Sequence, residues 1–140
     1  MLNSMGGASG VIFGSLYLAG AKDMEPKEAI KAKELAAMER KSLHAIQERG
    51  KAEVGDKTMV DALVPTADAL EANADNSLLD ALKAAEVAAK QGVEDTKKYV
   101  AKFGRASRLG ERSRGVLDAG AVSCCILLQS FADGIMEVIG

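Results

Sequence analysis

The longest periodic pattern in the sequence lies between Ser77 and Phe103, and it constrains the fold more than any other feature. Apolar and small side chains recur there at steps of three and four residues, the spacing of one face of an α-helix. Small side chains on this face let neighbouring helices approach closely. The pattern therefore predicts one long helix whose packed face carries Leu78, Leu82, Ala85, Ala89, Val93, Thr96, Val100 and Phe103.

The composition favours helices in the rest of the chain as well. Alanine, leucine, lysine and glutamate dominate, prolines number 2 in 140 residues, and aromatic residues make up 4%. No strand-like alternation persists beyond a few residues. We predict four further helices, at about residues 9–21, at 26–49, from 58 onward, and from 120 to the C-terminus. The first is apolar nearly all round, which is typical of a helix buried within a bundle.

Local signals support these helix boundaries. Pro26 suits a first helical turn, Gly50 suits a helix end, and Thr58 and Asp61 have the spacing of a capping box. Short loops between long helices force antiparallel neighbours. We therefore predict a single all-α domain over residues 1–140, an antiparallel bundle or barrel of up-and-down topology.

The charge balance gives no general attraction to polyanions. The chain has 18 lysines and arginines against 20 aspartates and glutamates, a net charge of −2. We expect neither nucleic acid nor a membrane as a partner, so any phosphate site must be local. His44, which lies mid-helix among charged residues, is interpreted as a surface residue.

Cysteine usage and hydropathy indicate a cytoplasmic protein. Cys124 and Cys125 are adjacent within an apolar run, a spacing that suits neither a disulfide between distant segments nor a zinc site. We interpret them as buried residues in a reducing compartment. The N-terminus lacks the pattern of a signal peptide, residues 11–21 are too short to span a bilayer, and residues 121–139 are interrupted by polar side chains.

Two glycine-rich connections each have a functional and a structural interpretation. Residues 5–10, Met-Gly-Gly-Ala-Ser-Gly, can expose backbone N–H groups to a phosphate at a helix start, or can simply allow close packing or a capped helix. Residues 50–59, GKAEVGDKTM, favour a solvated loop with Asp56 or Thr58 as N-cap. Met59 suits either a purine pocket or the core.

Residues 104–115, GRASRLGERSRG, form the most unusual connection because they carry four arginines. Arginines this close repel one another unless anions or carboxylates lie among them, and their guanidinium groups suit phosphate oxygens. Glu111 and Asp118 can pair with two of them, which leaves a purely structural ion-pair loop as the alternative. No Ser-His-Asp or Cys-His constellation accompanies these loops.

Four blocks in series resemble the nucleotide-binding L subunit of bacterial dihydroxyacetone kinase, also called glycerone kinase. They are GGASG at 6–10, GKAEVGDKTMVDALVP at 50–65, GRASRLGERSRG at 104–115 and DAGA at 118–121. The resemblance spans nearly the whole chain. It implies an antiparallel eight-helix barrel, of which about five helices are present here, with ADP or ATP bound at one open end. It also implies a partner, the K subunit, which holds dihydroxyacetone covalently on a histidine.

The resemblance also assigns nucleotide-binding positions in this sequence. Its glycine-rich loop covers the phosphates and its GRAS block contributes an arginine, while other positions contact the base or form an Asp-Pro-Gly turn. No catalytic residue or metal ligand is carried over. The matching residues are Ala8, Ser9, Gly50, Met59, which lies against the adenine, Arg105, Asp118, Ala119 and Gly120.

Members of the family work in two ways, and this chain resembles one of them. Some are fused or paired kinases that exchange ATP. In others the L subunit keeps ADP as a cofactor and is rephosphorylated by a phosphohistidine protein of the sugar phosphotransferase system. A short separate chain without a K domain resembles the second type.

Two departures from the family pattern qualify this expectation. The turn reads Asp118-Ala119-Gly120 in place of Asp-Pro-Gly, and Val116 stands where a histidine is common. The aspartate-rich block that supplies the Mg²⁺ ligands lies upstream of GGASG in the family and has no counterpart in this sequence. We therefore expect the 140-residue chain alone to lack substantial kinase activity, and to expose core-facing surface that favours homo-oligomers or binding of another chain.

Three functions follow from these observations. The first is an ADP- or ATP-binding kinase subunit that is incomplete as given. The second is a non-catalytic nucleotide-binding or regulatory interaction module with the same fold. The third is a relative that acts on another small substrate, through a domain of the fatty-acid kinase kind. The intact GDKTM and GRAS blocks favour the first, and the missing metal block favours the second.

Overall fold

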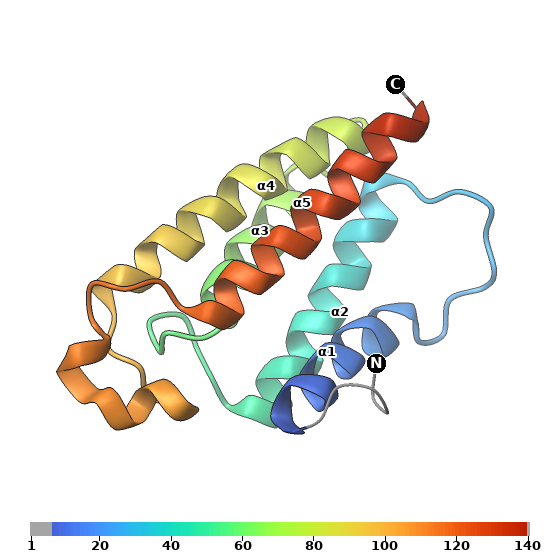
Figure 1. Cartoon of the computed structure of the whole chain (residues 1–140). Helices are drawn as coiled ribbons and strands as arrows, with labels where there is room; N and C mark the ends of the chain where they lie inside the picture. The colour runs from blue at the N-terminus through green and yellow to red at the C-terminus, as the bar shows by residue number, and fades with distance from the viewer. Residues whose placement is uncertain (1–6, 140) are drawn as a thin grey trace.

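The protein is built from helices joined by loops, as predicted (Figure 1). The structure, a computed structural model, describes residues 7–139. No β-strand occurs in that range. The helices are α1 (Gly7–Ala21), α2 (Ala32–Gly50), α3 (Val60–Ala72), α4 (Leu78–Asp95) and α5 (Ala119–Ile139), with 3₁₀ segments η1 (Thr96–Lys98) and η2 (Arg105–Ser113) between the last two.

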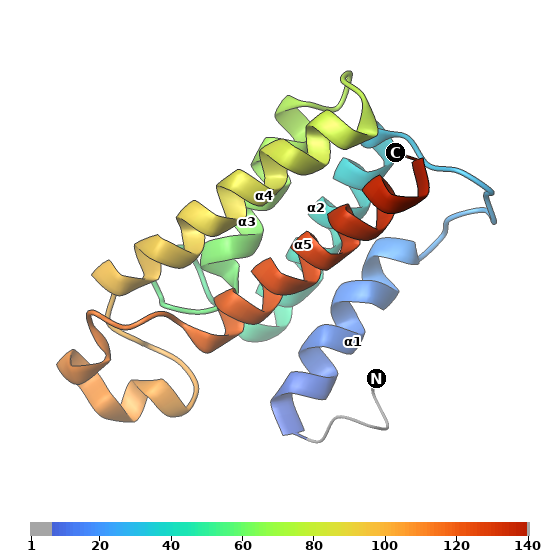
Figure 2. The ribbon, with the colours of Figure 1, turned by 45° about the horizontal axis from the view of Figure 1, so that its top comes forward.

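Helices α3, α4 and α5 lie side by side, and α2 joins them through α3 (Figures 1 and 2). Helix α1 packs mainly on α2 and lies at the margin of the bundle. Leu18 in α1 is 62% exposed. The prediction of a first helix buried within the bundle is therefore wrong, because among the described helices only α2 gives α1 an extensive partner.

The packed face predicted for residues 77–103 exists, but only its first part is helical. Ala81, Leu82, Ala85 and Ala89 of α4 are at most 1% exposed and pack against α3 and α5. Helix α4 ends at Asp95, and Phe103 is 41% exposed in a loop. The predicted helix was too long because the Thr96 hydroxyl turns back and donates to the Val93 carbonyl at 2.6 Å.

The second helix begins later than predicted. Pro26 lies in the connection before α2, not in its first turn. The Glu34 carboxylate accepts a hydrogen bond from the Lys31 backbone N–H at 2.9 Å, which closes the first turn at this point. Helix α2 therefore begins at Ala32, directly after the residue whose N–H the Glu34 carboxylate accepts, and six residues after Pro26.

Helix α5 is the longest of the described helices and borders the core on one face. Ala121, Cys124, Cys125 and Ala132 are buried, which confirms the interpretation of the cysteines as buried residues. Residues 119–138 are long and apolar enough to cross a membrane by length and composition, with a mean hydropathy of 1.5. A helix that closes the core of a soluble protein meets the same criteria, so this property does not assign a membrane location.

Helices α3 and α4 meet at a glycine. A Cβ atom on Gly92 would lie 2.2 Å from the Asp61 carbonyl oxygen and 3.1 Å from the Ala62 Cα. These are backbone atoms of α3, which cannot move aside as the end of a flexible side chain can. The contact between the two helices therefore requires glycine at position 92.

We predict that Gly92→Ala destabilises the protein by about 1–3 kcal/mol, the usual cost of overpacking a core. Urea unfolding measures the effect. Gly134→Ala in α5 is the matched control, because no atom lies within 4 Å of its added Cβ and alanine favours helix. Equal stability of the two variants would contradict the close approach of α3 and α4.

Candidate functional site

The predicted site residues gather at one end of the bundle, the lower end in Figure 1. The start of α1, the end of α2, the loop of residues 51–59, η2 and the start of α5 all lie there. Segments far apart in the sequence therefore contribute to one end of the molecule. The contacts below show which of these segments touch.

Met59 and the turn at Asp118–Gly120 are neighbours. A Cβ atom on Gly120 would lie 3.6 Å from both the Cβ and the backbone nitrogen of Met59, and 3.0 Å from Asp118 Oδ2. The start of α5 therefore lies close to Met59, the residue that precedes α3. The structure brings together two predicted binding elements that are about sixty residues apart in the chain.

Asp118 acts as the cap of α5. Its Oδ2 accepts the Ala121 N–H at 2.8 Å, and its own N–H donates to the Thr96 hydroxyl at 3.0 Å. Burial raises the pKa of the Asp118 carboxyl, and the backbone hydrogen bond from Ala121 opposes this rise. Asp118 forms no ion pair with an arginine in the described structure, so the suggested pairing with the arginine loop is wrong.

Asp61 holds the loop before α3 in place. This carboxylate, on a residue that is 2% exposed, accepts the N–H of Gly55 at 2.6 Å and of Thr58 at 2.7 Å. The bond from the Thr58 N–H to Asp61 is the acidic half of the predicted Thr58–Asp61 capping box. The Thr58 hydroxyl accepts the Val60 N–H at 3.2 Å, so the other half of the box is not formed in its usual way. The loop is thereby fixed by backbone donors to a buried carboxylate.

Lys57 links this loop to the segments that precede α5, a role that sequence reasoning missed. Lys57 is 3% exposed, and its Nζ donates to the carbonyl oxygens of Thr96, at 2.5 Å, and of Val116. Its backbone is left-handed, with φ 59°. Burial lowers the pKa of the Lys57 ammonium, and the charges of Asp118 and Asp61 oppose this effect. The loop is therefore anchored, not the freely solvated connection that its composition favoured.

Two polar contacts outside the Lys57 site also hold these loops. Lys102 Nζ pairs with Asp56 Oδ1 at 2.5 Å, and the Lys102 N–H donates to the Asp56 carbonyl at 3.1 Å. Asp56 Oδ2 accepts the Glu53 N–H at 2.8 Å, so Asp56 closes its own loop and does not cap α3. The segment after η1 is therefore tied to the loop before α3 at two points.

The arginine loop folds as two 3₁₀ turns that meet at Gly110, whose φ is 54°. The buried Ser113 hydroxyl accepts the Ala101 N–H at 2.9 Å and donates to the Gly110 carbonyl at 2.7 Å. Arg114 pairs with Glu111 at 3.0 Å, as the structural interpretation suggested for one arginine. Within this loop, the exposed guanidinium groups that form no ion pair with described residues are those of Arg105, Arg108 and Arg112.

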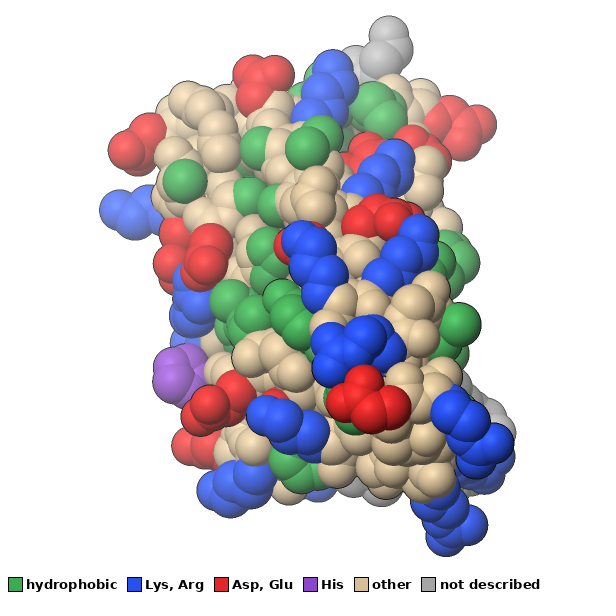
Figure 3. All heavy atoms as spheres, turned by 90° about the vertical axis from the view of Figure 1, so that its left-hand side faces the viewer, with side chains coloured by type: hydrophobic (Ala, Val, Ile, Leu, Met, Phe, Trp, Pro, Cys, Tyr) green, Lys and Arg blue, Asp and Glu red, His purple; other side chains and the backbone are tan. Residues whose placement is uncertain are grey.

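Positive charge therefore remains available at this end of the molecule. Figure 3 shows Lys and Arg side chains gathered over the middle and lower part of the face that carries η2. Guanidinium groups without a carboxylate partner suit an anionic ligand. The basic surface is local, in agreement with a net charge of −2 for the whole chain.

The remaining predicted positions lie at two other helix ends. Ala8 and Ser9 are in the first turn of α1, because the helix begins at Gly7, and their side chains lie outside the described residues. Gly50 is exposed at the end of α2, and Lys51 follows with φ 55° and donates its N–H to Gln47 O at 2.8 Å. Residues 7–10 of the GGASG block therefore form the first helical turn.

A Mg²⁺ site does not fit the residues that the structure describes. In that part of the chain, no three side chains of histidine, cysteine, aspartate or glutamate lie close enough to hold a metal ion. We derive no chemical step through a metal.

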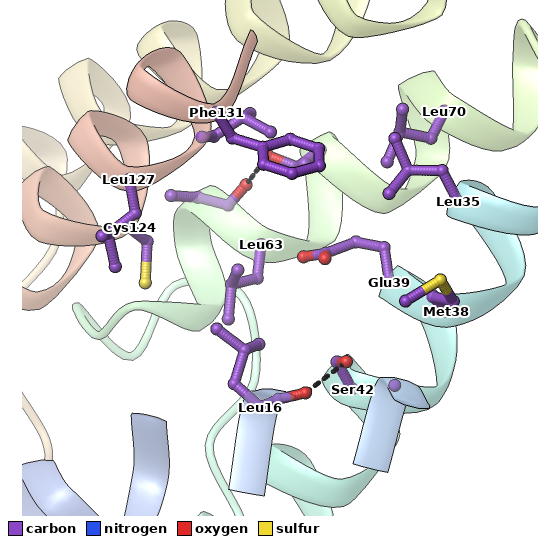
Figure 4. Close-up of a pocket in the computed structure, with 14 residues that line it drawn as sticks. Leu16, Leu35, Met38, Glu39, Ser42, Leu63, Leu70, Cys124, Leu127 and Phe131 are labelled. Carbon is purple, nitrogen blue, oxygen red and sulfur yellow. Dashed lines mark hydrogen bonds between the residues drawn. The ribbon is translucent and has the colours of Figure 1, made fainter. Parts of the chain in front are cut away.

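A separate, partly open apolar pocket of about 210 Å³ lies between α1, α2, α3 and α5, with the exposed Phe131 in its wall (Figure 4). Glu39 is the one charged residue in its lining. Burial raises the pKa of the Glu39 carboxyl to about 7. No sequence pattern marked Glu39, because it follows Met38 at an ordinary position of an amphipathic helix.

We predict that Lys57→Met lowers the free energy of unfolding by about 1–3 kcal/mol, because the Thr96 and Val116 carbonyls lose a charged donor. Urea unfolding measures the loss. Lys102→Met is the control, since it removes an exposed ammonium from a neighbouring contact and should cost less than about 1 kcal/mol. A Lys57→Met protein as stable as the wild type would contradict the anchoring role.

Comparisons with known proteins identify the family of the chain. The family model for the DAK2 domain matches residues 1–133. The ADP-binding subunit DhaL of the PEP-dependent dihydroxyacetone kinase of Escherichia coli is 39% identical over 134 residues, which cover 94% of this chain and 64% of the relative. The corresponding subunit of dihydroxyacetone kinase 2 of Listeria innocua is 37% identical, with coverage of 99% and 65%.

A solved structure has a similar fold. The dihydroxyacetone kinase from C. freundii in complex with AMP-PNP and Mg²⁺ superposes with a TM-score of 0.61 and 29% identity, over 93% of this chain and 20% of that one. The chain spans somewhat less than two thirds of the length of the curated subunits that it matches. On the evidence of the family match and the shared helical fold, the chain belongs to the DAK2 domain family.

Proposed function

We propose that this chain is the ADP- or ATP-binding part of a dihydroxyacetone kinase of the phosphotransferase-system type. Its relatives in Escherichia coli, Listeria innocua and Lactococcus lactis are named as ADP-binding subunits of such kinases. The observation that carries the proposal is that Met59 and Gly120 are neighbours at the basic end of the bundle. The partner would be the dihydroxyacetone-binding K subunit, and the location the cytoplasm.

The proposed site divides the nucleotide between three groups of residues. Met59 offers a flexible, polarizable side chain to the adenine and lies next to Gly120. The first turn of α1, with Ala8 and Ser9, has N–H groups without intrahelical acceptors, which suit phosphate oxygens. Arg105 adds an exposed guanidinium group that forms no ion pair in the described structure.

The other assigned positions shape the site. Asp118 and Ala119 start α5, and Asp118 is already engaged as the helix cap, so it would orient the turn more than bind the ligand. Gly50 ends α2 with open space where a Cβ would be. Lys57 and Asp61 do not contact the ligand in this proposal; they fix the loop that presents Met59.

Phosphoryl transfer needs cations that neutralise the phosphate oxygens, and the described residues offer no metal cage. We therefore propose that the 140-residue chain binds nucleotide but does not transfer phosphate by itself. The proposal also includes two protein partners. One is a phosphohistidine protein as the phosphoryl donor, and the other is a second copy of this chain in a homo-oligomer. The alternative is a non-catalytic nucleotide-binding or regulatory module, which the lack of a metal cage favours.

We predict that Arg105→Ala and Met59→Ala each weaken ADP binding by about tenfold, the equivalent of about 1.4 kcal/mol. Isothermal titration calorimetry with ADP measures the dissociation constants. Arg108→Ala is the matched control, because Arg108 lies on the same loop, is equally exposed and is not assigned to the site. Equal losses for Arg105→Ala and Arg108→Ala would indicate general charge attraction instead of a specific contact.

A turnover assay separates the kinase from the binding module. We predict no dihydroxyacetone phosphorylation above background when the 140-residue chain is mixed with a K subunit and either ATP or a phosphohistidine donor. The complete Escherichia coli subunit serves as positive control under the same conditions. Robust turnover by this chain would overturn the claim that it is inactive alone, whatever the ADP titration shows.

A further inference from the structure

Thr96 lies where three segments of the basic end meet. It follows the last residue of α4 and opens η1, and it is 0% exposed. The loop before α3 and the start of α5 both reach it (Figures 1 and 2). In the sequence Thr96 is only one member of the packed face of a predicted helix. Its contacts in the fold show a role that this periodic position does not explain.

The Thr96 hydroxyl uses its donor and its acceptor inside the protein. It donates to the Val93 carbonyl at 2.6 Å and accepts the Asp118 N–H at 3.0 Å. Because its hydrogen is committed to Val93, its lone pairs are left for Asp118. A main-chain N–H in the fold needs an acceptor, and Asp118 finds it on this hydroxyl. The hydroxyl therefore determines where the chain enters α5.

The Thr96 carbonyl holds the other side of the proposed base site. It accepts a hydrogen bond from the Lys57 ammonium at 2.5 Å. Lys57 stands two residues before Met59 in the chain. On the other side, Asp118 stands two residues before Gly120. One buried residue is thus bonded to both segments that bring the neighbours Met59 and Gly120 together.

Thr96 itself is not available to a ligand. The residue has no exposed surface, and its hydroxyl is engaged on both sides. Any effect of Thr96 on a ligand must therefore act through Met59 or through the turn at Asp118–Gly120. This separates Thr96 from the positions assigned to the nucleotide, which lie on the segments that it joins.

We propose that Thr96 is a positioning residue of the nucleotide site, which holds Met59 and the Asp118–Gly120 turn in one fixed arrangement for the base. This inference rests on the proposed function, and it adds a residue that touches no part of the nucleotide. The hydroxyl is the part of the arrangement that mutation can remove, because the carbonyl belongs to the main chain.

Two substitutions separate the hydroxyl of Thr96 from its packing. Thr96→Val keeps the branched shape and removes the hydroxyl, whereas Thr96→Ser keeps the hydroxyl and removes a buried methyl group. Thr66→Val is the matched control. Thr66 is 3% exposed in α3, and its hydroxyl donates to the Ala62 carbonyl of the same helix at 2.7 Å. The control therefore removes the same group from a bond within one helix.

Isothermal titration calorimetry of the 140-residue chain measures the dissociation constants of ADP and adenosine. We expect Thr96→Val to weaken both ligands by about tenfold, because the disturbed contacts are those of the base. Thr96→Ser and Thr66→Val should stay within about twofold of the wild type. Urea unfolding should show that all three variants are less stable than the wild type. Affinity then follows the hydroxyl at position 96 and not stability.

Hydrogen exchange tests the same contact without a ligand. The Asp118 amide of the free protein should exchange about tenfold faster in Thr96→Val than in the wild type, because its acceptor is lost. Thr96→Ser should restore the protection, since a serine hydroxyl can still accept this N–H. NMR follows this one amide in each variant.

Four results would overturn the proposal. Equal ADP affinity of the wild type and Thr96→Val would show that the hydroxyl positions nothing. A loss for ADP without a loss for adenosine would place the effect on the phosphates. An equal loss of affinity in Thr96→Ser would leave packing as the cause. Unchanged exchange of the Asp118 amide in Thr96→Val would exclude the contact itself.

Failure of the proposed function has a different signature. A wild-type protein that binds neither ADP nor adenosine would remove the nucleotide site, and the inference about Thr96 with it, even if the Asp118 exchange behaves as expected. Circular dichroism establishes that each variant is folded. If Thr96→Val does not fold, Thr96→Ala takes its place, because it differs from Thr96→Ser by the hydroxyl alone.

Discussion

The hydrogen bonds of the buried Lys57 ammonium hold together the end of the molecule on which the proposed function depends. They join the loop before α3 to the carbonyls of Thr96 and Val116, which lie at the two ends of the long connection between α4 and α5. A buried ammonium is costly unless its donors are satisfied, and here backbone carbonyls satisfy them. The position of Met59 beside Gly120 follows from this arrangement, because each lies directly after a segment that Lys57 holds.

The molecule thus separates two kinds of chemistry. At the basic end, polar contacts between loops organise the backbone and leave Arg105, Arg108 and Arg112 unpaired. In the interior, small side chains such as Ala81 and Ala85 bring the helices together, and the larger apolar residues surround the cavity. An anionic ligand therefore suits the first region.

The sequence predicted helix existence and packing better than helix ends. The alanine and leucine pattern of α4 identified its buried face correctly, since spacing alone decides which side chains share a face. Its end at Asp95 depends on Thr96, whose hydroxyl bonds both the preceding turn and the Asp118 N–H, and such a tertiary contact leaves no periodic signal. The late start of α2 at Ala32 has the same explanation, because Glu34 overrides the preference of Pro26.

The predicted site residues behave differently from one another. Met59 and Gly120 are neighbours in the fold. Lys57 and Glu39 were not singled out, because a single lysine or glutamate in a charged sequence carries no motif. The family resemblance identifies the binding positions. The structure identifies residues such as Lys57 that hold these positions in place.

The marginal place of α1 gives a bound nucleotide a mechanical role. Helix α1 is joined to the bundle mainly through α2, yet it carries the proposed phosphate-binding turn, while α3 and α5 carry the residues proposed to hold the base. A ligand that spans both would act as a cross-link between the first helix and the last. Its binding energy would then be shared between holding the nucleotide and keeping α1 docked, so nucleotide would protect this helix from local unfolding more than any other part of the chain.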